Sequence, residues 1–126
     1  MKLNYLLALS LSLGLILTSC GSGEDPEINI TAPAEGSTYA AGDVINFTGT
    51  ATDDEQVTGV RFEGVVSQVE YSGALDFSSI PDTSSVNFNL DVVLDTTIVA
   101  GQYEFMFIAT DNDDNEGTTT WSFNVE

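Results

Sequence analysis

Residues 102–110 read QYEFMFIAT, a stretch in which large apolar side chains stand at every second position. Successive side chains of a β-strand point to opposite faces, so this alternation predicts a strand with one buried face. The residues of that face are Tyr103, Phe105, Phe107 and Ala109. Met106 and Ile108 lie on the other face, which indicates a central strand that is partly covered on both sides.

The same alternation recurs along the chain after residue 26, interrupted by Gly, Pro, Asn and Asp. It predicts seven short strands, near residues 28–31, 44–51, 57–62, 65–71, 86–92, 102–110 and 121–125. About 100 residues of this kind favour an all-β fold, an immunoglobulin-like antiparallel β-sandwich. A small β-barrel is the structural alternative. Trp121 is expected in the core, and Tyr103 suits a tyrosine corner.

The first residues have a different character. Lys2 precedes an apolar run that extends from Tyr5 to Leu17. A positive charge followed by about 7–15 apolar residues predicts a secretory signal peptide, and the run is shorter than the roughly 18 residues of a membrane-spanning helix. We expect a cleaved signal peptide at residues 1–19, a lipidated cysteine with a flexible acidic tether at 20–26, and the Ig-like domain at 27–126.

Cys20 is the only cysteine, so the chain cannot form an intramolecular disulfide. The residues Leu17-Thr18-Ser19-Cys20 resemble the lipobox of bacterial lipoproteins. That resemblance implies cleavage before Cys20 and attachment of lipid to it. Its acyl chains would exceed the two anchoring signals needed for stable attachment, so the membrane is the first expected partner.

The charge of the chain restricts its other partners. The sequence has 20 Asp and Glu residues against Lys2 and Arg61, a formal net charge of −18. Loss of Lys2 with the signal makes this −19. Such a surface repels phosphate backbones, so we expect no nucleic-acid binding. The sequence also has no histidine, which excludes Ser-His-Asp and Cys-His catalysis, and we expect no enzymatic activity.

Two acidic segments form a candidate calcium site. In an Ig-like sandwich, the loops after the second and sixth of the predicted strands lie at the same end. Seven carboxylates fall in these loops without a basic residue, and Ca²⁺ prefers oxygen ligands of this kind. The residues selected as ligands are Asp53, Asp54, Asp111, Asp113 and Asn115. The alternative is a solvated turn, because Asp and Asn favour turns by themselves.

A second candidate site is the segment from Ser72 to Ser85, which we expect to be a long polar loop. Its apolar residues, together with the end of the preceding strand, could contact a protein or glycan partner. The residues selected are Tyr71, Leu75, Phe77 and Ile80. The alternative is that these side chains pack onto the edge of the sandwich.

Several short motifs occur in an order that resembles the Ig-like domains of bacterial surface proteins. Those motifs are Pro26-Glu27-Ile28-Asn29-Ile30, Gly42-Asp43-Val44-Ile45-Asn46-Phe47 and Ala109-Thr110-Asp111-Asn112-Asp113. In particular the chain resembles small lipoproteins of the Bacteroidetes with a single Ig-like domain. The resemblance implies an outer-membrane lipoprotein exposed on the cell surface, and it implies no activity.

Three functions remain open from the sequence. The first is a lipid-anchored binding or adhesion module of the cell envelope, with calcium stiffening one end. The second is a glycan- or nutrient-capture accessory that uses the 72–85 segment. The third, a hydrolase that uses paired carboxylates, is the weakest because it needs a cleft that one small sandwich rarely provides.

Overall fold

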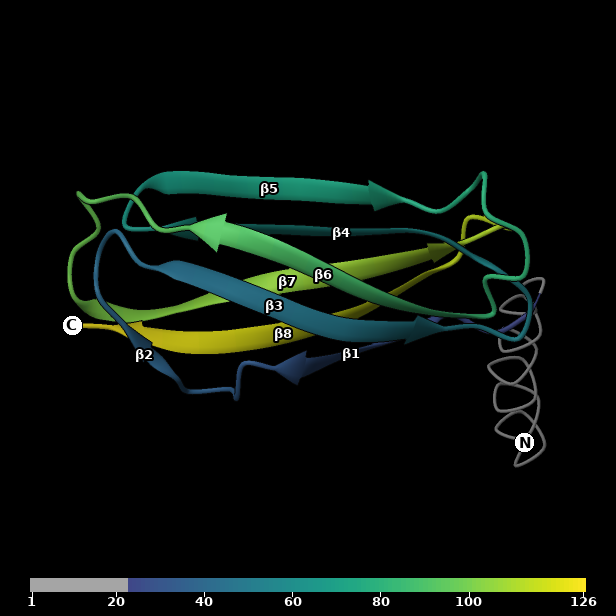
Figure 1. Ribbon diagram of the computed structural model, residues 1–126, viewed down its shortest axis with the longest axis horizontal. Helices are drawn as coiled ribbons and strands as arrows, with labels where there is room; N and C mark the ends of the chain where they lie inside the picture. Colours follow the sequence, from purple (N-terminus) through teal and green to yellow (C-terminus); the bar gives the residue numbers. More distant parts are fainter. Residues whose placement is uncertain (1–22) are drawn as a thin grey trace, which may run out of the picture.

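A computed structural model describes residues 23–126 and shows a sandwich of two β-sheets (Figure 1). The eight strands are β1 (Glu27–Ala32), β2 (Thr38–Tyr39), β3 (Val44–Thr52), β4 (Val57–Val66), β5 (Val69–Asp76), β6 (Ser85–Val93), β7 (Gly101–Asp111) and β8 (Glu116–Val125). The described residues contain no helix, and hence none that could cross a membrane. The predicted all-β, Ig-like sandwich is confirmed.

The two sheets differ in size. The smaller has the strand order β1-β3-β6 and the larger the order β2-β8-β7-β4-β5. The chain passes from the smaller to the larger sheet between β1 and β2, where Gly36 has a φ of 85° and its N–H donates to the Ser122 carbonyl at 2.8 Å. β2 is the strand absent from the sequence prediction, because two residues are too few to show an alternation.

Aromatic rings fill the space between the sheets. Phe47 of β3 is fully buried and meets rings of the larger sheet edge-on, at centroid distances of 4.7 Å to Trp121, 5.0 Å to Phe107 and 6.1 Å to Phe105. Edge-to-face contacts are favourable beyond the area they bury. Phe47 therefore joins the smaller sheet to three rings of the larger one, with Ile45 and Phe88 of the smaller sheet buried in the same core.

Two predicted core features are confirmed. The Tyr103 hydroxyl donates to the carbonyl of Val99 at 2.9 Å, which is the tyrosine corner at the start of β7. Trp121 is 3% exposed, and its indole Nε1 donates to the Pro33 carbonyl at 2.9 Å. The hydrogen bond between Trp121 and Pro33 holds the segment that connects β1 to β2 against β8.

The prediction for residues 57–85 was wrong in its boundaries. The two strands expected at 57–62 and 65–71 are instead a long hairpin, with β4 extending to Val66 and β5 beginning at Val69. The turn is Ser67-Gln68, whose φ values of 52° and 72° are both positive. Tight hairpin turns need such angles and usually use Asn or Gly, so the sequence gave a weak signal here.

Glycines inside strands caused the rest of that error. A Cβ on Gly64 would lie 2.5 Å from the Phe105 ring, and one on Gly73 would lie 2.6 Å from the Phe62 ring. These glycines make room for core rings within β4 and β5, and they do not mark turns. The predicted 72–85 loop therefore shortens to residues 77–84, because residues 72–76 belong to β5.

The strands run between two distinct ends of the sandwich. The tether end holds the start of β1 and the connections 53–56, 77–84 and 112–115. The far end holds the connections 40–43, 67–68 and 94–100 and the end of β8. Figure 1 shows the carboxyl terminus at the far end, opposite the start of β1.

The position of Phe47 gives a stability prediction. Replacing Phe47 with Ala should lower the free energy of unfolding by about 3–5 kcal/mol, because it empties a buried site between the sheets. Val44 of the same strand is 53% exposed, so Val44→Ala should cost less than about 1 kcal/mol. Denaturant unfolding of both variants tests this, and equal losses would contradict it.

Candidate functional site

The two acidic loops meet at the tether end, as the sequence predicted. The Asn112 N–H of the 112–115 connection donates to the Gln56 carbonyl of the 53–56 connection at 3.1 Å. The carboxylates of Asp53 and Asp111 are close enough to interact electrostatically, as are those of Glu55 and Asp113. The residues selected for calcium thus come from two neighbouring loops.

Asp111 has a structural role in this group. It is 2% exposed, and its Oδ1 accepts the N–H groups of Asp113 and Asn115, both at 2.8 Å. Its Oδ2 accepts the Asn115 side-chain amide at 3.0 Å. Burial alone would raise the pKa of Asp111, but these hydrogen bonds to the ionised form outweigh it and lower the pKa. The ionised carboxylate therefore organises the β7–β8 turn.

The neighbouring carboxyls are less well accommodated. Asp53 Oδ2 accepts the Glu55 N–H at 3.0 Å, whereas Oδ1 is shielded from solvent and has no hydrogen-bond partner among the described residues. Desolvation raises the pKa of Asp53, and the charges of Asp111 and Asp54 add to this. A hydrogen-bonding contact with Asp113 raises the pKa of Glu55, with further repulsion from Asp113, Asp54 and Asp53.

These carboxylates are neighbours without forming a cage. Among residues 23–126, no three acidic, histidine or cysteine side chains are grouped closely enough to hold one metal ion. Asp54 and Asp113 are exposed, and Asp111 already accepts three hydrogen bonds. Calcium binding by Asp53, Asp54, Asp111, Asp113 and Asn115 stays a prediction from the sequence.

The predicted contact loop is largely part of the fold. Tyr71 and Leu75 lie on β5, not in a loop, and both are half-buried against the core. The Tyr71 hydroxyl accepts the Asp95 N–H at 2.8 Å, and its ring lies 5.7 Å from that of Phe105. Phe77 also packs against the core, so Ile80, at 50% exposure, is the one selected residue that projects into solvent.

The lipidation prediction concerns residues outside the described range. Cys20 and the predicted signal peptide at 1–19 lie outside the described residues, which begin at Gly23. The described tether meets the domain at Gly117 of β8, where an added Cβ would collide with the backbone of Pro26. The chain that leads back to Cys20 therefore leaves from the tether end.

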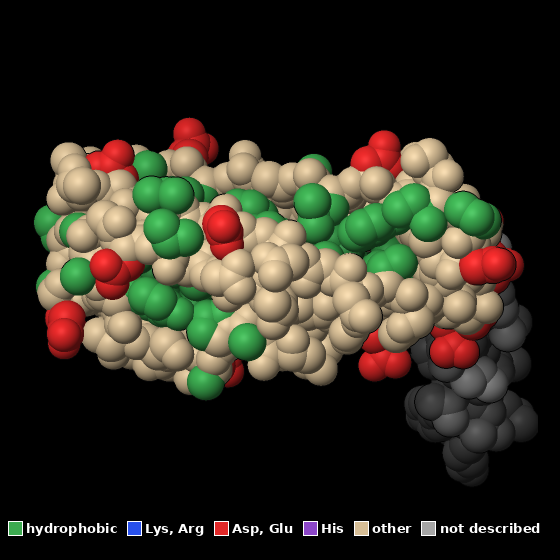
Figure 2. All heavy atoms as spheres, viewed as in Figure 1, with side chains coloured by type: hydrophobic (Ala, Val, Ile, Leu, Met, Phe, Trp, Pro, Cys, Tyr) green, Lys and Arg blue, Asp and Glu red, His purple; other side chains and the backbone are tan. Residues whose placement is uncertain are grey.

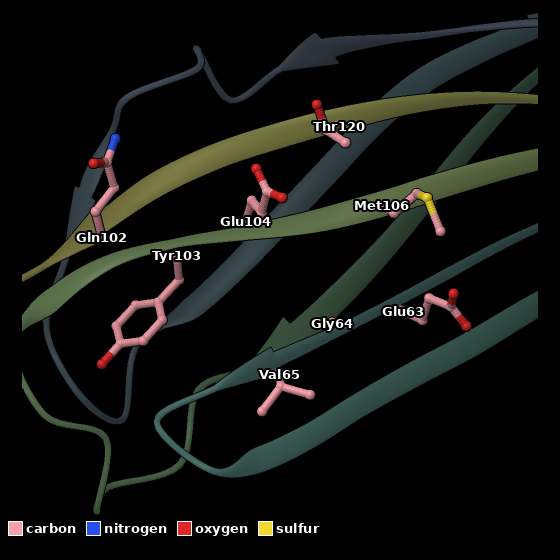
Figure 3. A pocket seen from close by; sticks show the side chains of 8 residues that line it. All are labelled: Glu63, Gly64, Val65, Gln102, Tyr103, Glu104, Met106 and Thr120. Atoms are coloured by element: carbon pink, nitrogen blue, oxygen red, sulfur yellow. The ribbon is translucent and has the colours of Figure 1, made fainter.

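Sequence reasoning missed a hollow on the outer face of the larger sheet. It measures about 480 Å³ and lies over β4, β7 and β8, with the side chains of Glu63, Val65, Glu104 and Met106 around it (Figure 3). Its signal in the sequence is the outward-facing phase of the alternation, which carries Glu63 and Val65 on β4 and Glu104 and Met106 on β7. Ile108, on the same outer face, is 1% exposed, which agrees with a partly covered central strand.

The charged side chains on the outside of the described molecule are almost all acidic. Figure 2 shows them scattered over the visible face, with hydrophobic groups reaching the surface toward each end and no basic side chain in view. Within residues 23–126 the single basic residue is Arg61, whose guanidinium lies 2.8 Å from Oε2 of Glu116.

The hydrogen bonds of Asp111 lead to a second stability prediction. Asp111→Ala should lower the free energy of unfolding by about 2–3 kcal/mol, because two N–H donors of the turn lose a charged acceptor. Asp113→Asn, two residues away and exposed, should change it by less than about 0.5 kcal/mol. Thermal or denaturant unfolding distinguishes the two, and a neutral Asp111→Ala would refute the role given to this carboxylate.

The raised pKa values of Asp53 and Glu55 give a pH dependence of stability. Ionisation of groups with raised pKa values costs folding free energy, and that cost disappears as they protonate. We expect the melting temperature to rise as the pH falls from neutrality toward 4.5, the ordinary value for Glu. Asp111, whose pKa is lowered, contributes stability that is lost only below its ordinary 3.8.

The double variant Asp53→Asn, Glu55→Gln should flatten that rise. The pair Glu35→Gln and Glu126→Gln removes the same charge from exposed positions away from the tether end and is the control. If both pairs flatten the profile equally, the effect belongs to the overall net charge and not to these loops.

Comparison with solved structures shows the same fold in proteins of distant sequence. A Niemann-Pick type C2 protein from Japanese carpenter ant matches with a TM-score of 0.53 at 16% identity, over 85% of this chain and 96% of that one. A sporulation control protein from Bacillus subtilis matches at 0.52 and 8% identity, over 84% of this chain and 50% of that one. A catalytically inactive OgpA from Akkermansia muciniphila, solved in complex with an O-glycopeptide substrate, matches with a TM-score of 0.52 at 12% identity. The match covers 82% of this chain and 30% of that one.

At such identities these likenesses concern the fold alone, and the chain spans half or less of the last two proteins. No curated protein matches significantly. The model of the bacterial Ig domain family matches residues 26–125, nearly the whole sandwich. Domains of this kind are typically non-catalytic binding or adhesion modules, often outside the cell or on its surface. The chain therefore belongs to the bacterial Ig domain family.

Proposed function

We propose that this chain is a lipid-anchored, surface-displayed Ig module of the bacterial cell envelope that works by binding a partner and not by catalysis. The observation that carries the proposal is the short distance in sequence between two features. The lipobox-like Leu17-Thr18-Ser19-Cys20 is followed within seven residues by Glu27, the first residue of the sandwich. An anchor and a binding module are thus joined with little else between them.

The tether limits how far the domain can stand from a membrane. Six residue steps separate Cys20 from Pro26, and an extended chain spans at most about 3.3–3.6 Å per residue. The tether end would therefore stay within about 20 Å of the anchor. Its acidic loops would face the membrane, where anionic headgroups repel them. This arrangement leaves the far end and the sheet faces available to partners.

The structure favours this proposal over the other two functions considered. A glycan-capture role through the 72–85 segment needs exposed aromatic rings, but Tyr71 and Phe77 pack against the core. Hydrolysis by paired carboxylates needs two acids in a cleft. At the tether end Asp54 and Asp113 are exposed, and the buried Asp111 has both carboxylate oxygens occupied by hydrogen bonds within its own turn. Calcium at that end remains part of the proposal as a stiffening of the loops near the anchor.

Anchoring is tested by Cys20→Ala in the full-length chain. The variant should disappear almost completely from the membrane fraction and lose incorporation of labelled fatty acid, because the other two anchoring routes, a spanning segment and a basic surface, are not offered by residues 23–126. Ser22→Ala, two residues later, is the matched control and should remain membrane-bound.

The lipid anchor and the display on the cell surface are tested by separate experiments. Retention of Cys20→Ala in the membrane fraction after removal of residues 1–19, or incorporation of labelled fatty acid into this variant, would overturn the lipid anchor. Protease digestion of intact cells tests display on the surface, because a chain on the outer face is cleaved and a periplasmic one is protected. Protection of the anchored chain would restrict the proposal to the periplasmic side.

A further inference from the structure

The outer face of the larger sheet carries a continuous shallow groove. Its main hollow, of about 480 Å³ over β4, β7 and β8, adjoins one of about 300 Å³ between β4 and β5 and one of about 380 Å³ between β7 and β8. The main hollow shares residues 63–65 with the second and residues 102–104 with the third. Neighbouring strands lie about 4.8 Å apart, so the groove crosses four strands over roughly 15 Å.

Strand register places a defined set of side chains along this groove. Glu63 of β4 lies opposite Met106 of β7, which in turn lies opposite Thr120 of β8. In the next row, Val65 of β4 lies opposite Glu70 of β5. Val65 is 59% exposed and can be contacted by a partner. The main hollow is thus lined by the apolar side chains of Val65 and Met106 and by the carboxylates of Glu63 and Glu104 (Figure 3).

The carboxylates of the groove outnumber the basic side chains near it. Glu63, Glu70 and Glu104 are exposed and lie on three neighbouring strands. Arg61, the single basic residue of 23–126, interacts electrostatically with Glu63, but its guanidinium is hydrogen-bonded to Glu116 at 2.8 Å. A second copy of the chain would bring the same negative face, which disfavours self-association here. Charge complementarity therefore selects a cationic occupant.

We propose that this groove binds an extended, lysine- or arginine-rich segment of a partner protein. The inference rests on the proposed function, since it names the class of partner that the module binds. The aliphatic stems of such residues can lie on Val65 and Met106 while their charged ends reach Glu63 and Glu104. The thioether of Met106 adapts to side chains of different shape. At β5 the sheet ends, so the groove is open and a longer segment can leave it.

The probe is a fluorescent peptide of about seven residues in which lysine and threonine alternate. The full chain is purified from cells and titrated into the peptide at near-physiological salt. If the purified chain carries lipid, it is kept in detergent or in nanodiscs of neutral lipid. We expect saturable binding below about 1 mM, and no binding of the same peptide with glutamine in place of each lysine. The Cys20→Ala chain can be assayed for peptide binding in the same way. Failure of the anchor and failure of peptide binding are therefore measured separately.

Variants locate the site. Glu63→Gln with Glu104→Gln should weaken binding about tenfold, whereas Glu27→Gln with Glu126→Gln, which removes equal charge from exposed sites elsewhere, should weaken it less than twofold. Val65→Ser leaves the charge unchanged and should also weaken binding, since it removes the apolar contact. Equal effects of the two charge pairs, an unaffected Val65→Ser variant, or binding that does not saturate would each overturn the proposal.

Discussion

The packing of Phe47 between the two sheets is the contact on which the rest of this structure depends. Its ring meets Trp121, Phe107 and Phe105 edge-on, and these in turn stack with or lie beside Phe123 and Phe62. A chain of this length with no disulfide has to obtain its stability from such burial. The rings are large, so some strand positions beside them have no room for a side chain. Gly64 and Gly73 occupy two such positions, and each faces a phenylalanine ring too closely for a Cβ to fit.

With the core apolar, nearly all of the charge lies outside. Asp111 is the buried exception, and it is tolerated because three hydrogen bonds satisfy its ionised form. The other acidic residues repel one another across turns and strand rows, and one ion pair, between Arg61 and Glu116, offsets little of this within residues 23–126. The result is a surface on which partners are selected by charge before they are selected by shape.

Membership of the bacterial Ig domain family explains the core but leaves the surface open. Solved structures at 8–16% identity share the arrangement of strands, so many sequences satisfy the same packing. The features of this chain that could carry a function lie outside the packing of the core. They are the acidic turns at the tether end, the groove over β4 and β7, and the lipobox-like residues 17–20. A function for this protein has to be argued from these features.

The sequence by itself determined the fold class, because alternating apolar residues such as those of 102–110 and 121–125 can be buried together only in paired sheets. It also predicted Tyr103 as a tyrosine corner, Trp121 as a core residue, and the meeting of the two acidic loops. It could not place the Ser67-Gln68 turn, since positive φ values at those residues follow from the pairing of β4 with β5. Nor could it distinguish Gly64 and Gly73 from turn glycines, because the rings that require them belong to residues of the folded core and not to sequence neighbours.

Only the tertiary structure decided that Tyr71, Leu75 and Phe77 pack against the core. It also decided which outward side chains share one groove, because the register between strands fixes which of them become neighbours. Those side chains are Glu63, Val65, Glu104 and Met106.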